Sequence, residues 1–298
     1  MRGVRRHLLH NSSSLAAVAT KSHPGTRSPH ATRFEAGSRL GIVLSFLLEP
    51  SRSPFRCRDC DRVTKGRPIR DCHIITPAGI THAMALYVAG LWRYPIKTLA
   101  GEPLAAAAVG ADGIAGDRLV RVCGPDGLRT SRRFHRLLGL KGVIGPGGRP
   151  LIDGHTWDSP RALSLVRAAS GEDAWLEETD ATGRFDVLPL LVATDGAVAA
   201  FGRDVRRLRP NILIGGVEGL DEFAWPGTEL HIADAIIRLD SRRSRCPMTT
   251  VDPDTLDVDP EVLRDIGRRF GGRIALNADV IHAGSIRIGD TVTLIRKP

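Results

Sequence analysis

Short apolar segments follow one another closely from Tyr87 onward, and turns rich in glycine separate them. The turn Gly-Pro-Asp-Gly at 124–127, for example, stands between apolar residues at 119–122 and a short segment at 128–130. Parallel neighbours in a sheet need crossover connections of about a dozen or more residues, and these intervals leave little room for them. The spacing therefore predicts a mainly β (α+β) fold, built from mostly antiparallel strands closed into β-barrels, with a few helices.

The same alternation predicts the positions of further strands. They are expected at residues 151–152, 163–166, 174–178, 211–214, 274–276 and 280–281. A hairpin is expected to end the chain, with residues 286–288 and 291–295 joined by a turn at Gly289 and Asp290.

Two segments show helical spacing instead. Asp195 is the expected N-cap of the first, in which apolar residues recur at steps of three and four from 198 to 208 before Pro210 ends the helix. The second is expected to begin at Asp259 and Pro260 and to end at Gly271.

The positive charge of the chain is confined to its first part. Residues 1–83 hold 14 Lys and Arg against 5 Asp and Glu, which leaves 28 of each sign for residues 84–298. Because the basic segment is also rich in Ser, Arg and Pro, we expect it to be largely disordered. The charge therefore gives no reason to expect nucleic-acid binding by the folded part.

Two interpretations of this extension remain open. Residues 1–34 are basic and contain no acid, as in an organellar transit peptide. Alternatively Met84 is the true start and the protein is cytoplasmic, because strand-like sequence begins there at once. Cys57, Cys60 and Cys72 do not have the spacing of a closed zinc site. The longest apolar run, 40–48, is too short to span a membrane, which takes about 20 residues.

Cys246 is the residue whose surroundings point most clearly to chemistry. It follows the strand-like residues 236–239 and lies beside arginines in the run Ser-Arg-Arg-Ser-Arg-Cys. Cationic neighbours favour the thiolate, which is both a nucleophile and a soft metal ligand. The alternative is a small buried hydrophobic residue. Five cysteines in 298 residues do not form a dense disulfide framework, so a reducing compartment is expected.

The segment from Ser244 to Asp254 resembles the signature of MOSC domains, which are similar to the C-terminal domain of molybdenum cofactor sulfurases. Within that family the chain resembles the mitochondrial amidoxime-reducing component and its bacterial relatives. Four more segments agree in the same order, and the resemblance spans residues 86–295. They are residues 94–98 (YPIKT), 116–118 (GDR), 209–211 (RPN), and 270–271 (FG) together with 286–290.

The resemblance implies an N-terminal MOSC β-barrel domain at 84–185 and a MOSC domain at 186–298. It also implies that Cys246 is the catalytic residue and the molybdenum ligand of a bound molybdenum cofactor. Arginine pairs with phosphate in a bidentate fashion, lysine offers a point charge, and amide or hydroxyl groups bind pterin edges. The residues expected to contact the cofactor are Lys97, Thr98, Arg118, Thr194, Asp195, Arg209, Asn211, Ser244 and Arg245.

The implied function is a molybdenum-dependent oxidoreductase that reduces small N-hydroxylated, amidoxime-type compounds. Electrons are expected from a separate reductase, ferredoxin or flavoprotein, because the chain lacks the cysteine quartet of an iron–sulfur cluster. Pyridoxal phosphate is not expected. Amidoxime reducers carry an aromatic residue where this chain has Gly272 and Arg273, so substrate preference does not transfer. Two alternatives remain: sulfur transfer through a persulfide on Cys246, and a carrier that binds the cofactor without turnover.

Overall fold

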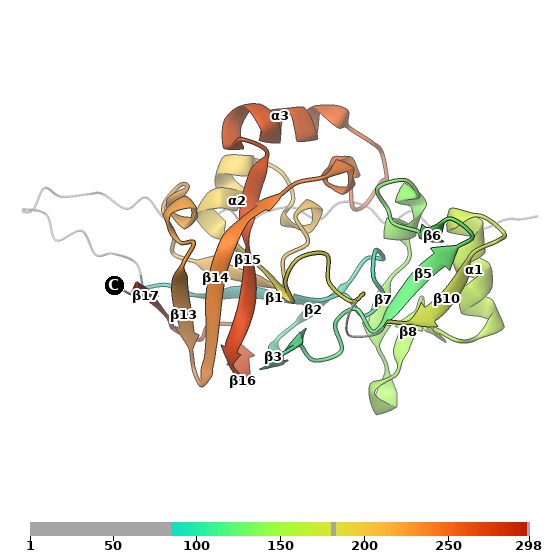
Figure 1. Cartoon of the computed structure of the whole chain (residues 1–298), viewed down its shortest axis with the longest axis horizontal. Helices are drawn as coiled ribbons and strands as arrows, with labels where there is room; N and C mark the ends of the chain where they lie inside the picture. Colours follow the sequence, from blue (N-terminus) through green and yellow to red (C-terminus); the bar gives the residue numbers. More distant parts are fainter. Residues whose placement is uncertain (1–84, 180–182, 297–298) are drawn as a thin grey trace, which may run out of the picture. The chain divides into compact units, whose positions relative to one another are not determined.

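The computed structural model describes residues 85–179 and 183–296, which form strands and three α-helices (Figure 1). The prediction of a mainly β fold with a few helices is confirmed. The predictions for the extension, including its disorder, its targeting role and its three cysteines, lie outside the described residues. The boundary predicted between residues 185 and 186 stays a prediction.

An eight-stranded sheet is the largest element, with the order β17-β13-β14-β15-β11-β12-β1-β2. All its ladders are antiparallel except the one between β11 and β12, which the segment containing α2 connects. The strands are β1 (Tyr87–Arg93), β2 (Glu102–Leu104), β11 (Leu190–Thr194), β12 (Ile212–Gly215), β13 (Thr228–Ile232), β14 (Ala235–Ser244), β15 (Arg273–His282) and β17 (Val292–Arg296).

The predicted closure into a barrel is not found, because no continuous ladder closes the eight-stranded sheet among the described strands. Tyr87 and Thr291 form an isolated bridge between the beginnings of β1 and β17. Backbone hydrogen bonds flank it, from Val88 N to Asp290 O at 2.9 Å and from Val292 N to Leu86 O at 2.8 Å. The two strands thus meet at their ends only.

Three smaller sheets complete the described β structure. The first contains β10 (Trp175–Glu178), β5 (Val120–Gly124) and β6 (Gly127–Leu128). The second contains β16 (Gly284–Arg287), β3 (Ala106–Gly110) and β4 (Gly113–Ile114), and the third contains β7 (Gly142–Ile144), β8 (Pro150–Ile152) and β9 (His155–Thr156).

The predicted C-terminal hairpin is wrong. β16 pairs with β3, whereas β17 pairs with β13. The turn between them is bound to β1 instead, because Gly289 N donates to Val88 O at 2.8 Å. A local turn signal could not reveal that the two strands join different sheets.

The helices are α1 (Pro160–Ser170), α2 (Asp195–Phe201) and α3 (Pro260–Phe270). The third was predicted with its caps: the Asp259 carboxylate accepts from Glu261 N at 3.0 Å, and Gly271 has a left-handed φ of 62°. The strand predicted at 163–166 lies inside α1 and is wrong. The Ser159 hydroxyl caps that helix by accepting from Ala162 N at 3.2 Å, and Pro160 opens its first turn.

The N-cap of α2 lies one residue earlier than predicted. Thr194, and not Asp195, is the N-cap, since its hydroxyl accepts from Ala197 N at 3.2 Å. The helix ends at Phe201, before Gly202 in the left-handed conformation, and residues 205–207 form a separate 3-10 turn. The predicted single helix through residue 208 is therefore too long.

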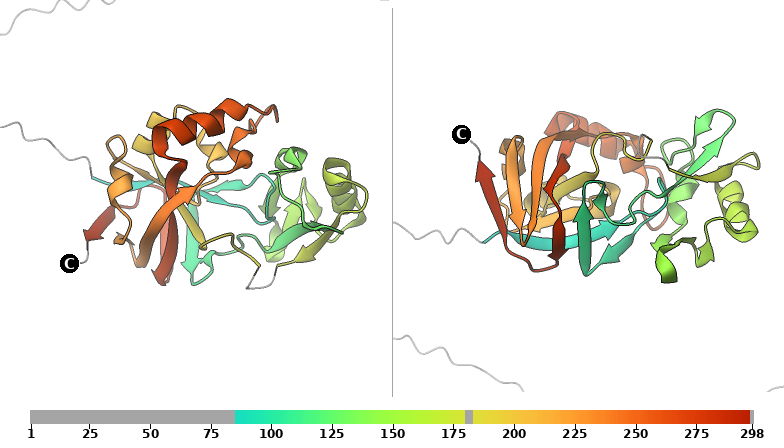
Figure 2. Two further views of the ribbon diagram at one scale, coloured as in Figure 1. Left: turned by 45° about the horizontal axis from the view of Figure 1, so that its top comes forward. Right: turned by 60° about the horizontal axis from the view of Figure 1, so that its bottom comes forward.

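Two large apolar clusters form most of the described core. One consists largely of side chains from the eight-stranded sheet and includes Leu91, Ile212, Leu239 and Leu276. The other joins β5, β10 and α1 through residues such as Val122 and Val166. A third cluster packs α2 and α3 against each other over the larger sheet (Figure 2).

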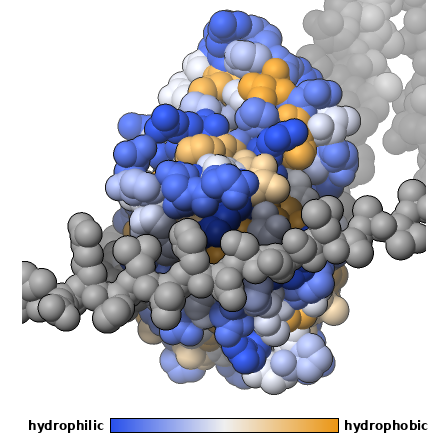
Figure 3. All heavy atoms as spheres, turned by 90° about the vertical axis from the view of Figure 1, so that its right-hand side faces the viewer, coloured by the Kyte–Doolittle hydropathy of each residue, from blue (hydrophilic) through white to orange (hydrophobic). Residues whose placement is uncertain are grey.

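The face at the right of Figure 1 carries mostly hydrophilic side chains with smaller hydrophobic areas (Figure 3). Among the described residues, no helix is both long enough and apolar enough to cross a membrane.

Glu222 is a fully buried carboxylate that joins three parts of the fold. It lies in the 3-10 helix η4 (Asp221–Ala224) and accepts from Thr194 N at 3.1 Å, Thr194 Oγ1 at 2.8 Å and Ala275 N at 2.9 Å. Burial raises the pKa of Glu222, and the hydrogen bonds from Thr194 and Ala275 oppose that change. The carboxylate therefore links η4, α2 and β15 at the cost of its own desolvation.

We expect Glu222→Ala to lower the free energy of unfolding by about 3 kcal/mol, because three buried donors lose their acceptor. Urea unfolding followed by circular dichroism measures this. Glu218→Ala, at an exposed carboxylate nearby, is the control and should change stability by less than about 0.5 kcal/mol. Equal effects of the two substitutions would contradict the role given to Glu222.

Candidate functional site

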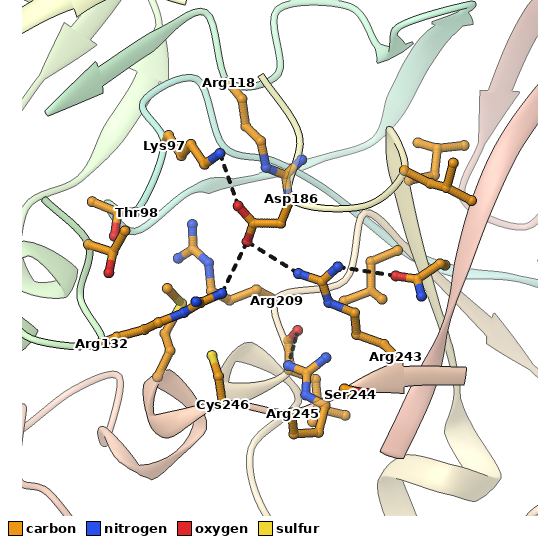
Figure 4. Close-up of a pocket in the computed structure, with 17 residues that line it drawn as sticks. Lys97, Thr98, Arg118, Arg132, Asp186, Arg209, Arg243, Ser244, Arg245 and Cys246 are labelled. Atoms are coloured by element: carbon orange, nitrogen blue, oxygen red, sulfur yellow. Dashed lines mark hydrogen bonds and ion pairs between the residues drawn. The ribbon is translucent and has the colours of Figure 1, made fainter. Parts of the chain in front are cut away.

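A pocket lies where the ends of several strands meet between the two large apolar clusters. Its walls come from the loop after β1, the loops after β4 and β6, the start of β11 and the end of β14. Seven of the ten predicted site residues line it: Lys97, Thr98, Arg118, Arg209, Ser244, Arg245 and Cys246 (Figure 4). The structure thus brings together residues that lie up to 149 positions apart in the chain.

Cys246 follows β14 and is the N-cap residue of the 3-10 helix η5 (Pro247–Thr250). Its carbonyl accepts from Thr249 N at 3.0 Å and from Thr249 Oγ1 at 2.9 Å, which fixes the backbone that carries the thiol. The thiol itself is free and partly exposed. The backbone is therefore held in place while the sulfur stays accessible.

Cys123 has a different environment. It is buried in β5, and its thiol donates to Glu177 Oε1 at 3.2 Å. Burial raises the pKa of Cys123 to about 11, and the Glu177 carboxylate adds to that rise. Of the two described cysteines, Cys246 alone combines exposure with a position in the pocket.

Cationic side chains dominate the described lining of the pocket. Six cationic residues line the pocket, and Asp186 is the one carboxylate among the described lining residues. The cations are Lys97, Arg118, Arg132, Arg209, Arg243 and Arg245. Such an excess of one sign in a partly buried site favours an anionic ligand.

Asp186 pairs with three of these cations at once. Its carboxylate lies 3.0 Å from Lys97 Nζ, 3.2 Å from Arg243 Nη2 and 3.5 Å from Arg132 Nη2 (Figure 4). Burial acts to raise the pKa of Asp186, but the hydrogen bond and charge of Lys97, with both arginines, outweigh it and lower the pKa. The carboxylate is therefore ionised at neutral pH.

Tyr94 supports two further arginines of the pocket. The Arg209 guanidinium lies 4.1 Å from the centre of the Tyr94 ring, and that of Arg118 lies 5.8 Å away. Burial lowers the pKa of Arg209, and it raises that of Tyr94 to about 12. The Tyr94 hydroxyl donates to Pro210 O at 3.0 Å, so the ring serves as a neutral platform for the cations.

Arg245 carries an unpaired polar atom. Its Nη2 donates to Leu208 O at 2.8 Å, whereas the buried Nε is one of three buried side-chain polar atoms without a hydrogen-bond partner among the described residues. Burial lowers the pKa of Arg245 to about 10. A buried donor without an acceptor is costly, and an anionic ligand in the pocket could supply that acceptor.

Three pocket residues have left-handed backbone conformations. The φ angles are 83° for Thr98, 50° for Arg118 and 55° for Arg209, and such values are uncommon outside glycine. Thr98 is held by its hydroxyl, which accepts from Ser131 N at 2.6 Å. Strained conformations of this kind concentrate at ligand sites, where surrounding contacts maintain them.

Two of the predicted residues, Thr194 and Asp195, do not line the pocket. Thr194 is fully buried and bonds to Glu222, as described above. The Asp195 carboxylate accepts from Gly196 N at 2.8 Å, from Gly216 N at 2.8 Å and from Val217 N at 3.0 Å. Both side chains are occupied in joining α2 to the loop after β12.

Asn211 also lies outside the pocket lining, but it is connected to it. The buried side chain accepts from Leu191 N at 3.1 Å and donates to Asp117 Oδ2 at 3.3 Å. The same Asp117 oxygen pairs with Arg118 Nη1, and its other oxygen accepts from Tyr94 N at 2.6 Å. Asn211 therefore helps to position the Asp117 carboxylate, with which Arg118 forms an ion pair.

The sequence predictions did not include Arg132, Arg243 or Asp186. Arg243 was within reach of sequence reasoning, because it directly precedes Ser244 in the arginine-rich run. Arg132 follows β6 and Asp186 precedes β11, and neither belongs to a motif that marks it. Only the fold brings these two residues to the Cys246 thiol.

The space at the site is divided. The pocket encloses about 90 Å³, and a more open cavity of about 460 Å³ adjoins it. Both are lined by Arg132, Asp186, Arg243, Ser244, Arg245, Cys246 and Asn277. The described residues hold no cluster of three or more His, Cys, Asp or Glu suited to a metal ion, so a metal here would need ligands beyond the one thiol.

Comparison with known proteins identifies relatives. Residues 191–293 match the model of the MOSC domain family. The chain is 27% identical over 126 residues to mitochondrial amidoxime reducing component 2 of Macaca fascicularis, which covers 36% of this chain. The match covers 37% of the length of that relative.

Solved structures that are similar to this chain include the YUAD protein of Bacillus subtilis and YiiM of Geobacillus stearothermophilus. The first is 12% identical, with a TM-score of 0.42, and the comparison covers 72% of this chain and 98% of the other. The second is 16% identical, with a TM-score of 0.29, and covers 36% of this chain and 54% of the other. The family match confirms the resemblance predicted from sequence, and it places a MOSC domain at residues 191–293 of this chain.

Proposed function

We propose that the pocket binds a molybdenum cofactor, with Cys246 as the protein ligand to the metal, and that the protein reduces N-hydroxylated compounds. The observation that carries this proposal is the convergence of one accessible thiol and six cations on a single pocket. The MOSC domain and the distant amidoxime-reducing relative associate the chain with this cofactor.

The donor set of the pocket fits a molybdopterin-type ligand. Such a ligand carries a phosphate for the cations, and its dithiolene supplies the sulfur ligands that the protein lacks. The unpaired Arg245 Nε offers a further donor to the bound group. The pocket of about 90 Å³ is too small for a pterin, but the adjoining cavity of about 460 Å³ reaches the usual range for small-molecule sites.

The cofactor, when bound, supplies the two-electron redox chemistry. In an amidoxime the N–O bond would break, and two electrons and two protons would yield an amidine and water. Electrons would come from a separate redox partner, such as a reductase, ferredoxin or flavoprotein.

The residues of the chain would bind the cofactor and orient it in the pocket. Tyr94 holds the Arg209 guanidinium by its ring, so that this arginine presents a fixed planar donor group. Asp117, positioned by Asn211, does the same for Arg118. The hydrogen bonds from Thr249 N and Thr249 Oγ1 to Cys246 O fix the start of η5 and so the position of the thiol.

We expect Cys246→Ser to lower the rate of benzamidoxime reduction by about a hundredfold or more while the fold is kept, because the hydroxyl is a poor substitute for a thiolate ligand. The assay uses molybdenum-loaded protein with reduced methyl viologen as the donor. Cys123→Ser is the matched control and should stay within about twofold of the parent rate. Unchanged turnover in Cys246→Ser would end the proposal.

The same purified protein separates the two alternatives. Protein that holds a persulfide on Cys246 and no molybdenum would favour sulfur transfer. Bound cofactor without reduction of any N-oxygenated substrate would favour a carrier.

Arg245→Ala should lower the molybdenum retained per protein after gel filtration by roughly tenfold, because the pocket loses a cation and the unpaired Nε donor. Inductively coupled plasma mass spectrometry gives the metal content. Arg161→Ala removes an exposed charge from α1 and should leave the content unchanged. Equal retention in the two variants would show that Arg245 takes no part in binding.

A further inference from the structure

The Asp186 carboxylate occupies the point at which three cations from separate elements converge. Lys97 lies in the loop after β1, Arg132 follows β6, and Arg243 lies near the end of β14. The Lys97 and Arg243 side chains are only 10% and 21% exposed, so their charges are poorly solvated. The carboxylate therefore offsets the repulsion among these three cations, which water screens only in part.

We propose that Lys97, Arg132 and Arg243 form a phosphoryl-binding subsite whose resting occupant is the Asp186 carboxylate, so that the anionic group of the ligand binds by displacing Asp186. This inference rests on the proposed function in so far as the natural ligand is the phosphate-bearing cofactor. It adds Arg132 and Arg243 to the binding residues and gives Asp186 the role of an exchangeable counter-ion.

The charges of the two anions favour the exchange. A carboxylate has one negative charge and two oxygens, whereas a phosphate monoester has up to about two charges and three free oxygens. One carboxylate thus balances only part of the charge of three cations, and a phosphoryl group balances more of it and accepts more hydrogen bonds. The Asp186 side chain is 41% exposed, so it can leave the subsite directly into solvent.

The neighbours of Asp186 are anchored without its carboxylate. Gly183 O accepts from Lys97 Nζ at 3.2 Å, and Arg184 donates from Nε to Asp117 O at 2.8 Å. The Phe185 ring lies under two guanidinium groups, those of Arg118 at 5.7 Å and Arg184 at 5.3 Å. A rotation of the Asp186 side chain therefore does not require the segment to detach.

Displacement would also enlarge the site. Asp186 and Arg243 form an ion pair and line both the pocket of about 90 Å³ and the cavity of about 460 Å³. Moving the carboxylate away from these shared lining residues would widen the connection between the two spaces.

The test measures binding of inorganic pyrophosphate to the full chain, purified without cofactor, by isothermal titration calorimetry at one ionic strength. Asp186→Asn removes the competing charge and should tighten binding roughly tenfold relative to the parent. Asp186→Glu keeps the charge and should stay near the parent value. The control Asp173→Asn removes an equal charge from an ion pair with Arg129, outside the pocket, and should change affinity by less than about twofold.

Unchanged or weaker binding in Asp186→Asn, or no pyrophosphate binding in either protein, would overturn the inference. Arg132→Gln alters a side chain that is 48% exposed, so the fold should tolerate it, and it provides a second test. It should weaken pyrophosphate binding several-fold, and parent-like binding would count against the subsite. Tighter binding by Asp186→Asn in a protein that never acquires molybdenum would refute the proposed function alone, whereas molybdenum-loaded protein with unchanged pyrophosphate binding would refute the inference alone.

Discussion

Repulsion among the six cations of the pocket is the constraint on which the site depends. The chain offsets part of it internally, through Asp186 on one side and Asp117 on the other. Burial makes the remainder costly, as the lowered pKa values of Arg209 and Arg245 indicate. An anionic ligand beside the free thiol would offset the repulsion that these carboxylates leave.

The fold supports this charge by placing rigid neighbours behind it. Tyr94 lies under Arg209, and its backbone N–H is bound by Asp117, which in turn pairs with Arg118 and accepts from Asn211. This chain of contacts joins the loop after β1 to the start of β12. Arg118 and Arg209 both have left-handed backbone, and Arg118 N donates to Tyr94 O at 2.8 Å.

Local signals in the sequence predicted those structural features that depend on residues nearby in the chain. The caps of α3 at Asp259 and Gly271 and the cationic run around Cys246 are such cases. The motif residues Thr194, Asp195 and Asn211 were expected to contact a cofactor, but the structure gives each of them buried or backbone partners. No local signal could place Asp186 or Arg132, because their proximity to Cys246 arises only when strands distant in the sequence pair.

We propose that Cys246 is the protein ligand to a cofactor-bound molybdenum within this cationic pocket. X-ray absorption at the molybdenum edge, recorded on the full chain after expression with cofactor biosynthesis, tests it most directly. We expect a sulfur neighbour of molybdenum that is present in the parent protein and absent in Cys246→Ser, while the remaining sulfur signal persists. An identical sulfur shell in the two proteins would contradict it.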